Sequence, residues 1–204
     1  KEIWPLCNTS DLIGAIQHPE DGYIQPADLT QALATGARNR GAEIYRNTTV
    51  VGIKQTKDGW VVETDKGTIE CEHVVSCSGN FARQTGKMVG IDIPVIPVEH
   101  QYIVTEPHPE IQKRKKEGLP EMGVLRDSDS RWYMREEAGG LILGPYEDGA
   151  PCCYVDGPSK DSEYELFQED LERLAPHIEG AIHRVPAFGE VGVKKVYNGA
   201  ICYT

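Results

Sequence analysis

The first part of the chain has the pattern of a helix that leads into a strand. After Pro26, small and apolar residues recur at helical spacing as far as Ala37, and Gly41 is the expected end of the helix. Small side chains on its buried face would let this helix lie close to a sheet. A short apolar stretch follows at once, so we expect a strand at 42–45.

Residues 49–79 alternate between β-forming runs and turn residues. We expect an antiparallel meander whose three strands are separated by turns: 49–53, 60–64 and 68–71. A β-branched run at 73–79 ends on small residues, which predicts a buried strand whose end another group approaches closely. Together these elements are typical of half of an α/β nucleotide-binding domain.

The pattern changes after Gly90 and predicts a second, mostly antiparallel sheet. A polar stretch with four consecutive basic residues lies within it and is typical of a solvated loop or short helix, 107–120. Ala138 and the glycines after it are the expected turn of a hairpin. The strands that we expect are 100–105, 123–125, 131–136, 140–144 and 191–197.

A helix is expected beyond residue 162. Ser162 and Glu165 have the spacing of a capping box, and apolar residues then recur at helical intervals up to Ile182. Because Pro176 falls inside this stretch, we expect the helix to bend or restart there.

The composition narrows the class of protein. The chain has 204 residues and a formal charge of −11 at pH 7, which allows one domain or two small ones. An excess of acidic over basic residues disfavours a hold on nucleic acid. No apolar run approaches the roughly 20 residues that a membrane span needs, so we expect neither nucleic acid nor membrane as a partner.

The cysteines show neither the spacing of a disulfide framework nor that of a zinc site. We therefore interpret them as free thiols in a reducing compartment and expect no metal. This interpretation predicts a cytoplasmic location, with the mitochondrial matrix as the alternative. The six are Cys7, Cys71, Cys77, Cys152, Cys153 and Cys202.

No common catalytic motif decides the chemistry. The sequence has no GxGxxG turn, Walker loop, GxSxG or HExxH, and nothing selects one serine or cysteine as a nucleophile. Three short stretches stand out because they combine aromatic, histidine and charged residues: 100–102, 132–135 and 144–147.

A family resemblance rests on stretches that occur in a recognisable order: 21–23 with Pro26, 74–82, 97–102, 131–136 and 144–147. In these stretches the chain resembles the glycine oxidase and D-amino acid oxidase superfamily, and within it the dimethylglycine and sarcosine dehydrogenase group. The resemblance runs over nearly the whole chain.

The resemblance implies a mixed α/β (α+β) fold. A partial FAD-binding domain of the glutathione-reductase-like α/β type would be joined to a substrate domain made of a mostly antiparallel sheet with helices. The expected parts are a segment that enters the active-site region, the partial FAD-binding domain, the substrate domain and the start of the return to the FAD domain: 1–20, 21–92, 93–198 and 199–204. Because the family's glycine-rich turn for the FAD pyrophosphate is missing, we interpret the chain as a central fragment.

The activity that the resemblance implies is oxidation of a secondary or tertiary amine, such as dimethylglycine or sarcosine. A hydride would pass from the carbon next to nitrogen to flavin N5, and oxygen or an electron-transfer protein would reoxidise the FAD. The alternative is a non-catalytic module that binds a small molecule or a partner on the same scaffold. The exact amine, the acceptor and the oligomeric state stay open.

Two positions match the family's active site. The resemblance implies that His100 sets the protonation and position of the substrate and that the Tyr133 hydroxyl orients it. Arg135 would hold a carboxylate if it shares the face of Tyr133, which requires that no bulge intervenes. By residue type alone, a buried histidine or tyrosine is more often structural.

The cofactor contacts are also implied by the resemblance. The strand after the first helix would contact adenine at Val51, and the small residues that end the next strand would contact the dinucleotide at Cys77, Ser78 and Gly79. The plain alternatives are an ordinary strand residue at Val51 and a simple turn glycine at Gly79.

Overall fold

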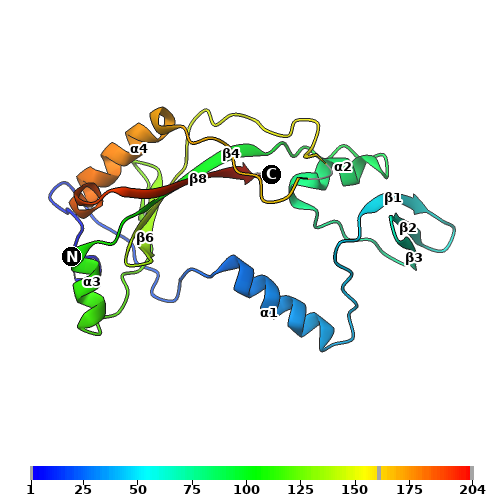
Figure 1. The fold of residues 1–204 in the computed structure, drawn as a ribbon, viewed down its shortest axis with the longest axis horizontal. Helices are drawn as coiled ribbons and strands as arrows, with labels where there is room; N and C mark the ends of the chain where they lie inside the picture. Colours follow the sequence, from blue (N-terminus) through cyan, green and yellow to red (C-terminus); the bar gives the residue numbers. More distant parts are fainter. Residues whose placement is uncertain (1, 160–161, 203–204) are drawn as a thin grey trace. The chain divides into compact units, whose positions relative to one another are not determined.

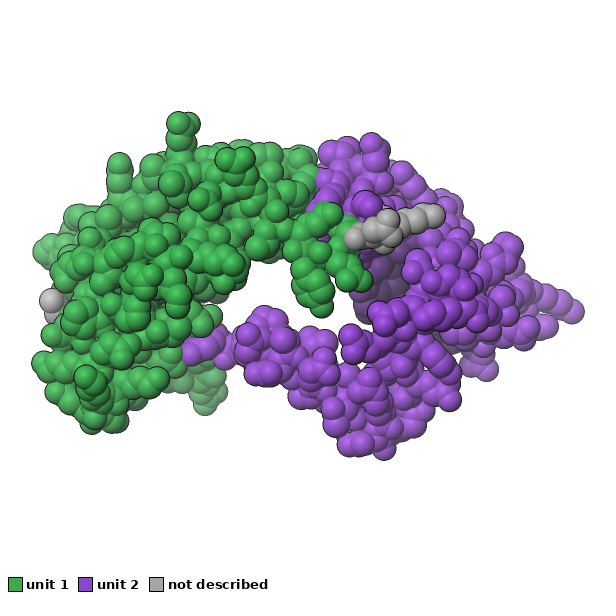
Figure 2. Space-filling model, viewed as in Figure 1, with its two compact units in different colours: residues 1–22, 98–153, 162–201 green, residues 23–97, 154–161, 202–204 purple. Residues whose placement is uncertain are grey.

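Two units make up the chain in the computed structural model, which describes residues 2–159 and 162–202 (Figure 2). Unit 1 consists of residues 1–22, 98–153 and 162–201, and unit 2 of residues 23–97, 154–161 and 202–204. Residues 203 and 204, at the end of the expected 199–204 segment, lie outside the described residues.

Unit 2 begins with α1 (Pro26–Arg38) and a three-stranded antiparallel sheet (Figure 1). The α1 start is specified locally, because Pro26 stands at its first position and the Gln25 side chain accepts a hydrogen bond from Ala27 N. The strands are in the order β1-β2-β3, with bounds Val50–Gln55, Trp60–Thr64 and Gly67–Cys71. The expected helix and meander are confirmed, but none of the residues of α1 is buried, so the buried face expected for this helix was wrong.

Two strands expected in unit 2 are absent from the described residues. Residues 42–45 are irregular chain, and residues 72–78 are irregular before η1 (Gly79–Phe81) and α2 (Ala82–Lys87). Both predictions were wrong for the same reason: a strand needs a hydrogen-bonded neighbour, and no neighbouring strand pairs with either segment. The Val75 side chain is 82% exposed as a result.

Unit 1 contains a five-stranded antiparallel sheet in the order β5-β6-β7-β4-β8 (Figure 1). The expected second sheet is confirmed, although most of its strand ends shift by one to four residues. Ala138 and Gly139 both have positive φ and form the tight turn between β6 and β7. The strands are β4 (Val98–Thr105), β5 (Leu125–Asp127), β6 (Trp132–Glu137), β7 (Gly140–Pro145) and β8 (Val193–Ile201).

The apolar core of unit 1 lies on one face of this sheet. Ile103, Met134 and Leu143 are cross-strand neighbours, and all three are fully buried against Leu174 and Ala181 of α4. The core also takes in α3 (Pro109–Lys116) through Ile111 and η2 (Pro186–Glu190) through Phe188. No helix in residues 2–159 and 162–202 is long and apolar enough to cross a bilayer.

The helix α4 (Leu171–Arg184) starts later than the sequence indicates. Ser162 does donate a hydrogen bond to Glu165, but no helix begins there, so the capping-box prediction was wrong. Asp170 is the actual cap, and its carboxylate accepts from Arg173 N at 3.0 Å. Helix α4 continues through Pro176 without restarting.

The N-terminal segment of unit 1 is fixed to the end of α4. The buried Arg184 side chain pairs with Asp11 and Asp127 and donates to Asn8 O at 2.8 Å. Hydrogen bonds from Arg184 and His183 hold the pKa of Asp11 well below its usual range. Residues 8–11 are therefore part of the folded unit.

Unit 2 exposes apolar side chains that a folded protein would normally cover. Ile53 and Val95 are its buried hydrophobic residues among those described, whereas Leu33 and Val75 are exposed. We expect the 204-residue chain to self-associate, because such surfaces drive association. Light scattering after gel filtration should show mass rising with protein concentration.

The substitution Val75→Asp should lower this association, and Gln55→Asp, which adds the same charge at an exposed polar position, should change it less. A sharp monomer peak at high concentration would contradict the prediction.

Candidate functional site

The face of the sheet opposite the core carries the candidate site. Along β4, Gln101 and Ile103 point to the core side and are fully buried. Because side chains alternate along a strand, His100 and Tyr102 lie on the other face. We call this second face the open face. Its side chains from β4 are half-buried.

Strand β6 brings two more predicted residues to the open face. The β6–β7 pairing runs without a shift, with Tyr133 opposite Gly144 and Arg135 opposite Ile142. No bulge separates Tyr133 from Arg135, so they share one face. This is the condition under which the sequence predicts that Arg135 holds a substrate carboxylate. The structure therefore places His100, Tyr133 and Arg135 on the same face of one sheet.

Tyr146 links His100 to Tyr133. Its ring centroid lies 6.5 Å from that of His100 and 6.1 Å from that of Tyr133, and both ring pairs are tilted. The three rings form a cluster across β4, β6 and the end of β7. The sequence analysis singled out 144–147 as a stretch but did not assign Tyr146 to the site.

The aromatic surface continues toward β8. Tyr102 stacks on Tyr197 with ring centroids 4.7 Å apart, and Lys195 Nζ lies 4.3 Å from the Tyr197 ring centroid. These residues were not predicted as site residues, because their proximity depends on the β4–β8 register.

The Tyr133 ring lies directly on the backbone of β7. A methyl group at Gly144 would overlap the ring and its hydroxyl, so the ring can take this position only because residue 144 has no side chain. Gly144 thus sets the height of the Tyr133 hydroxyl above the sheet.

The two arginines on the strands of this sheet differ in their partners. Arg135 forms an ion pair with Glu137 and donates to Glu136 O at 2.8 Å. Arg126, on β5, is the cross-strand neighbour of Tyr133 on β6. Its guanidinium lies 5.8 Å from the centroid of the Tyr133 ring, and its Nη1 donates to Tyr146 Oη at 2.6 Å. Sequence reasoning missed Arg126, although a hairpin register through 128–131 could have placed it beside Tyr133.

His100 is the titratable group at the centre of the cluster. Burial lowers the pKa of His100 below its ordinary value of 6.5, and the Glu147 carboxylate opposes part of this shift. The imidazole is therefore mostly neutral at pH 7 and can accept a proton.

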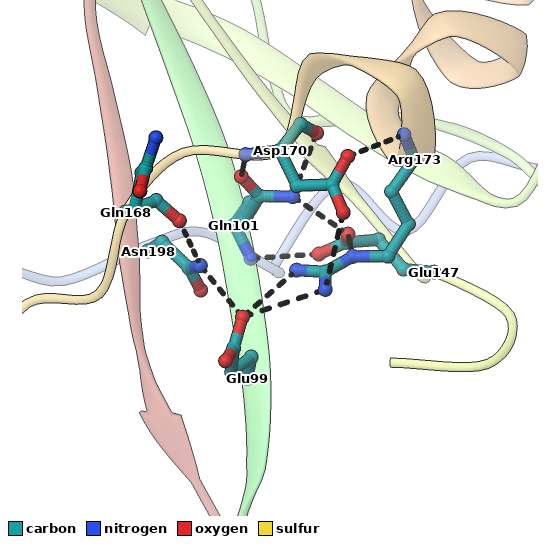
Figure 3. A network of polar contacts seen from close by, with 7 residues as sticks. All are labelled: Glu99, Gln101, Glu147, Gln168, Asp170, Arg173 and Asn198. Carbon is teal, nitrogen blue, oxygen red and sulfur yellow. Dashed lines mark hydrogen bonds and ion pairs between the residues drawn. The ribbon is translucent and has the colours of Figure 1, made fainter. Parts of the chain in front are cut away.

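A buried polar network holds the segment after β7 (Figure 3). The Glu147 side chain, 1% exposed, accepts from Gln101 N at 2.8 Å and from Gln101 Nε2 at 2.9 Å, and it pairs with Arg173 at 2.6 Å. Because Tyr146 directly precedes Glu147, the network also fixes where the Tyr146 ring can lie.

The rest of the network joins β4, β8 and the start of α4 (Figure 3). Glu99 pairs with Arg173 and accepts from Asn198 Nδ2 at 2.8 Å, and Gln101 Oε1 accepts from Asp170 N at 2.8 Å. A hollow of about 550 Å³ opens beside this network, and the acidic residues in its lining outnumber the one basic residue, Arg173. Like charges repel, so this hollow does not suit a carboxylate-bearing ligand.

The predicted cofactor residues lie in unit 2. Val51 is 56% exposed on β1, Cys77 is exposed, and Ser78 Oγ lies 2.7 Å from Ser76 Oγ. Gly79 begins η1 with φ +52, and no atom lies within 4 Å of where its Cβ would be. The backbone at Gly79 is thus open to close approach by a ligand.

Comparison with known proteins identifies the family. The FAD dependent oxidoreductase family, DAO, matches residues 1–204. The chain belongs to this family. Dimethylglycine dehydrogenase of Rattus norvegicus and sarcosine dehydrogenase of Homo sapiens are 39% and 35% identical to the whole chain, which spans 24% and 22% of their lengths.

Solved structures agree. The crystal structure of L-proline dehydrogenase from P. horikoshii matches all of this chain and 50% of its own, with a TM-score of 0.79 and 26% identity. The DAO resemblance, the mixed α/β fold and FAD as the cofactor of this family are confirmed.

Removing the Glu147 charge should weaken the fold and shift the titration of His100. We expect Glu147→Gln to cost about 3 kcal/mol of unfolding free energy, because it leaves the Arg173 charge short of a buried partner. The pKa of His100 should fall further, since the opposing carboxylate is lost. Denaturant unfolding and NMR titration of the imidazole protons would measure both.

The neighbouring substitution Asp148→Asn removes the same charge from an exposed pair with Arg131 and should change neither quantity appreciably. A His100 pKa that rises in Glu147→Gln would contradict this account of the site.

The contact between Tyr133 and Gly144 can be tested separately. Gly144→Ala should cost about 1–3 kcal/mol of unfolding free energy because the new methyl overlaps the ring. The cost should largely disappear in Tyr133→Ala/Gly144→Ala, which a double-mutant cycle measures. Gly123→Ala, whose Cβ would meet open space, is the control and should be nearly neutral.

Proposed function

We propose that this chain supplies the substrate-contacting face of an FAD-dependent amine dehydrogenase or oxidase. Its substrate would be a secondary or tertiary amino acid such as dimethylglycine or sarcosine. The observation that carries the proposal is the open face, where a neutral histidine and two tyrosines cluster in a chain of the DAO family. The relatives named dimethylglycine and sarcosine dehydrogenase support the substrate class.

His100 would prepare the amine for oxidation. An alkylamine carries a proton at neutral pH, and its nitrogen lone pair must be free before a hydride can leave the adjacent carbon. The neutral imidazole of His100 can accept that proton, because burial favours its uncharged form. FAD, when bound, would supply the two-electron chemistry that accepts the hydride.

Tyr133 would orient the substrate. Its ring lies on the β7 backbone, so the hydroxyl projects from a fixed height on the open face. A hydroxyl held in this way can hydrogen-bond one substrate group without paying much ordering entropy. Arg135 adds positive charge to the same face, although its guanidinium is already engaged by Glu137.

The residues present fit part of an FAD site. The exposed Val51 offers an apolar contact for adenine, and the open backbone at Gly79, flanked by Cys77 and Ser78, would allow a dinucleotide to approach closely. The sequence has no glycine-rich GxGxxG turn for the pyrophosphate, so these residues would supply only some of the contacts.

We also propose that the protein resides in a reducing compartment. All six cysteines are free, which supports the cytoplasm or the mitochondrial matrix. The names of the dehydrogenase relatives place those proteins in mitochondria and favour the second.

The spectrum of the full-length parent protein tests the function. Recorded without oxygen, its flavin band should bleach when sarcosine or dimethylglycine is added. We expect His100→Asn to slow bleaching at least 100-fold, a usual magnitude for loss of a proton-transfer group. Tyr133→Phe should slow it about tenfold through loss of one hydrogen bond.

The wild-type bleaching rate should fall as the pH drops through the lowered pKa of His100, and His100→Asn should lose this dependence. His18→Asn and Tyr164→Phe, which change exposed residues, are the matched controls. A bound flavin that neither amine bleaches would move the substrate elsewhere in the family, and a protein without flavin would favour the non-catalytic module.

A further inference from the structure

Arg126 occupies a distinct place at the edge of the aromatic cluster. It is the cross-strand neighbour of Tyr133, and its guanidinium lies 5.8 Å from the Tyr133 ring centroid. Its Nη1 donates to Tyr146 Oη at 2.6 Å. Two of the three clustered rings therefore hold this exposed side chain in position.

The charge of Arg126 is not neutralised by the protein. Arg131, Arg135, Arg173 and Arg184 of unit 1 each pair with at least one carboxylate. Arg126 has no carboxylate within 4.0 Å in residues 2–159 and 162–202. Its neighbour Asp127 is engaged by Arg184 instead.

We propose that Arg126 binds the carboxylate of the substrate, with Tyr146 holding the guanidinium and the rings of His100, Tyr133 and Tyr146 receiving the alkylated amine end. The identity of that substrate rests on the proposed function. A guanidinium presents its N–H donors in a plane that matches both oxygens of a carboxylate.

Arg135 is less suited than Arg126 to bind the substrate carboxylate. Glu137 and the Glu136 carbonyl already take hydrogen bonds from Arg135 Nη1, so a substrate carboxylate would compete with a charged group next to it. The whole chain carries a formal charge of −11, which repels anions at long range. A carboxylate-bearing substrate therefore needs a local cation whose charge is not already used.

Binding of an unreactive ligand separates this subsite from catalysis. 3-Methylbutanoate has the shape of dimethylglycine with carbon in place of nitrogen, so no amine can be oxidised. 3-Methylbutan-1-ol lacks the charge and is the matched neutral ligand. Calorimetric titration of both into the full-length FAD-containing protein reports on the carboxylate contact alone.

We expect Arg126→Gln to raise the Kd of 3-methylbutanoate about 30-fold or more, because a charge-assisted pair of hydrogen bonds is lost. The Kd of the alcohol should change less than threefold. The Kd of 3-methylbutanoate for Arg126→Lys should lie between those for Arg126→Gln and wild type, since lysine keeps the charge and loses the planar fork. Arg135→Gln is the control and should raise the Kd of 3-methylbutanoate less than Arg126→Gln does.

Flavin content and thermal midpoint would confirm that each variant is folded. The proposal is overturned if wild type does not bind 3-methylbutanoate or if Arg126→Gln binds it as wild type does. It is also overturned if Arg126→Gln raises the Kd values of 3-methylbutanoate and 3-methylbutan-1-ol equally. If Arg126→Gln loses the carboxylate while neither amine bleaches the wild-type flavin, the anion subsite stands and the proposed amine oxidation fails.

Discussion

The buried carboxylate of Glu147 is the point on which the geometry of the open face depends. It joins the backbone and side chain of Gln101 on β4 to Arg173 on α4, and so ties an inner strand of the sheet to the helix that covers the core. Breaking such a pair leaves an uncompensated charge, which costs far more than the loss of an exposed pair. The network therefore fixes the segment after β7 more firmly than a surface loop would be fixed.

Alternation along β4 carries this constraint to the other face of the sheet. Gln101 points into the network, so its neighbour His100 must point away from it. Tyr146, next to Glu147, then lies close enough to contact both His100 and Tyr133. One side of the strand supplies rigidity and the other supplies chemistry, and a one-residue slip of register would exchange the two.

The sequence predicted those parts whose cause is local. Trp60–Thr64 matches its expected strand, and the β6–β7 hairpin follows from its turn residues. The strand expected at 73–79 was wrong because β-branched residues cannot form a strand without a paired neighbour. The start of α4 was wrong because Asp170, rather than Ser162, provides the cap. His100 and Tyr133 were placed by family resemblance, whereas Arg126 and Tyr146 join the cluster only through strand register, which composition does not reveal.

The contact between the Tyr133 ring and Gly144 limits how a site of this kind can diversify. A ring that rests on bare backbone has no side chain beneath it that could be enlarged or trimmed, so the floor of the site is set by the peptide plane itself. Selectivity for substrate size must then be tuned at the rim, by residues such as Tyr197 and Lys195 on β8. Directed evolution toward bulkier ligands should accordingly recover changes on the outer strands and leave the floor untouched.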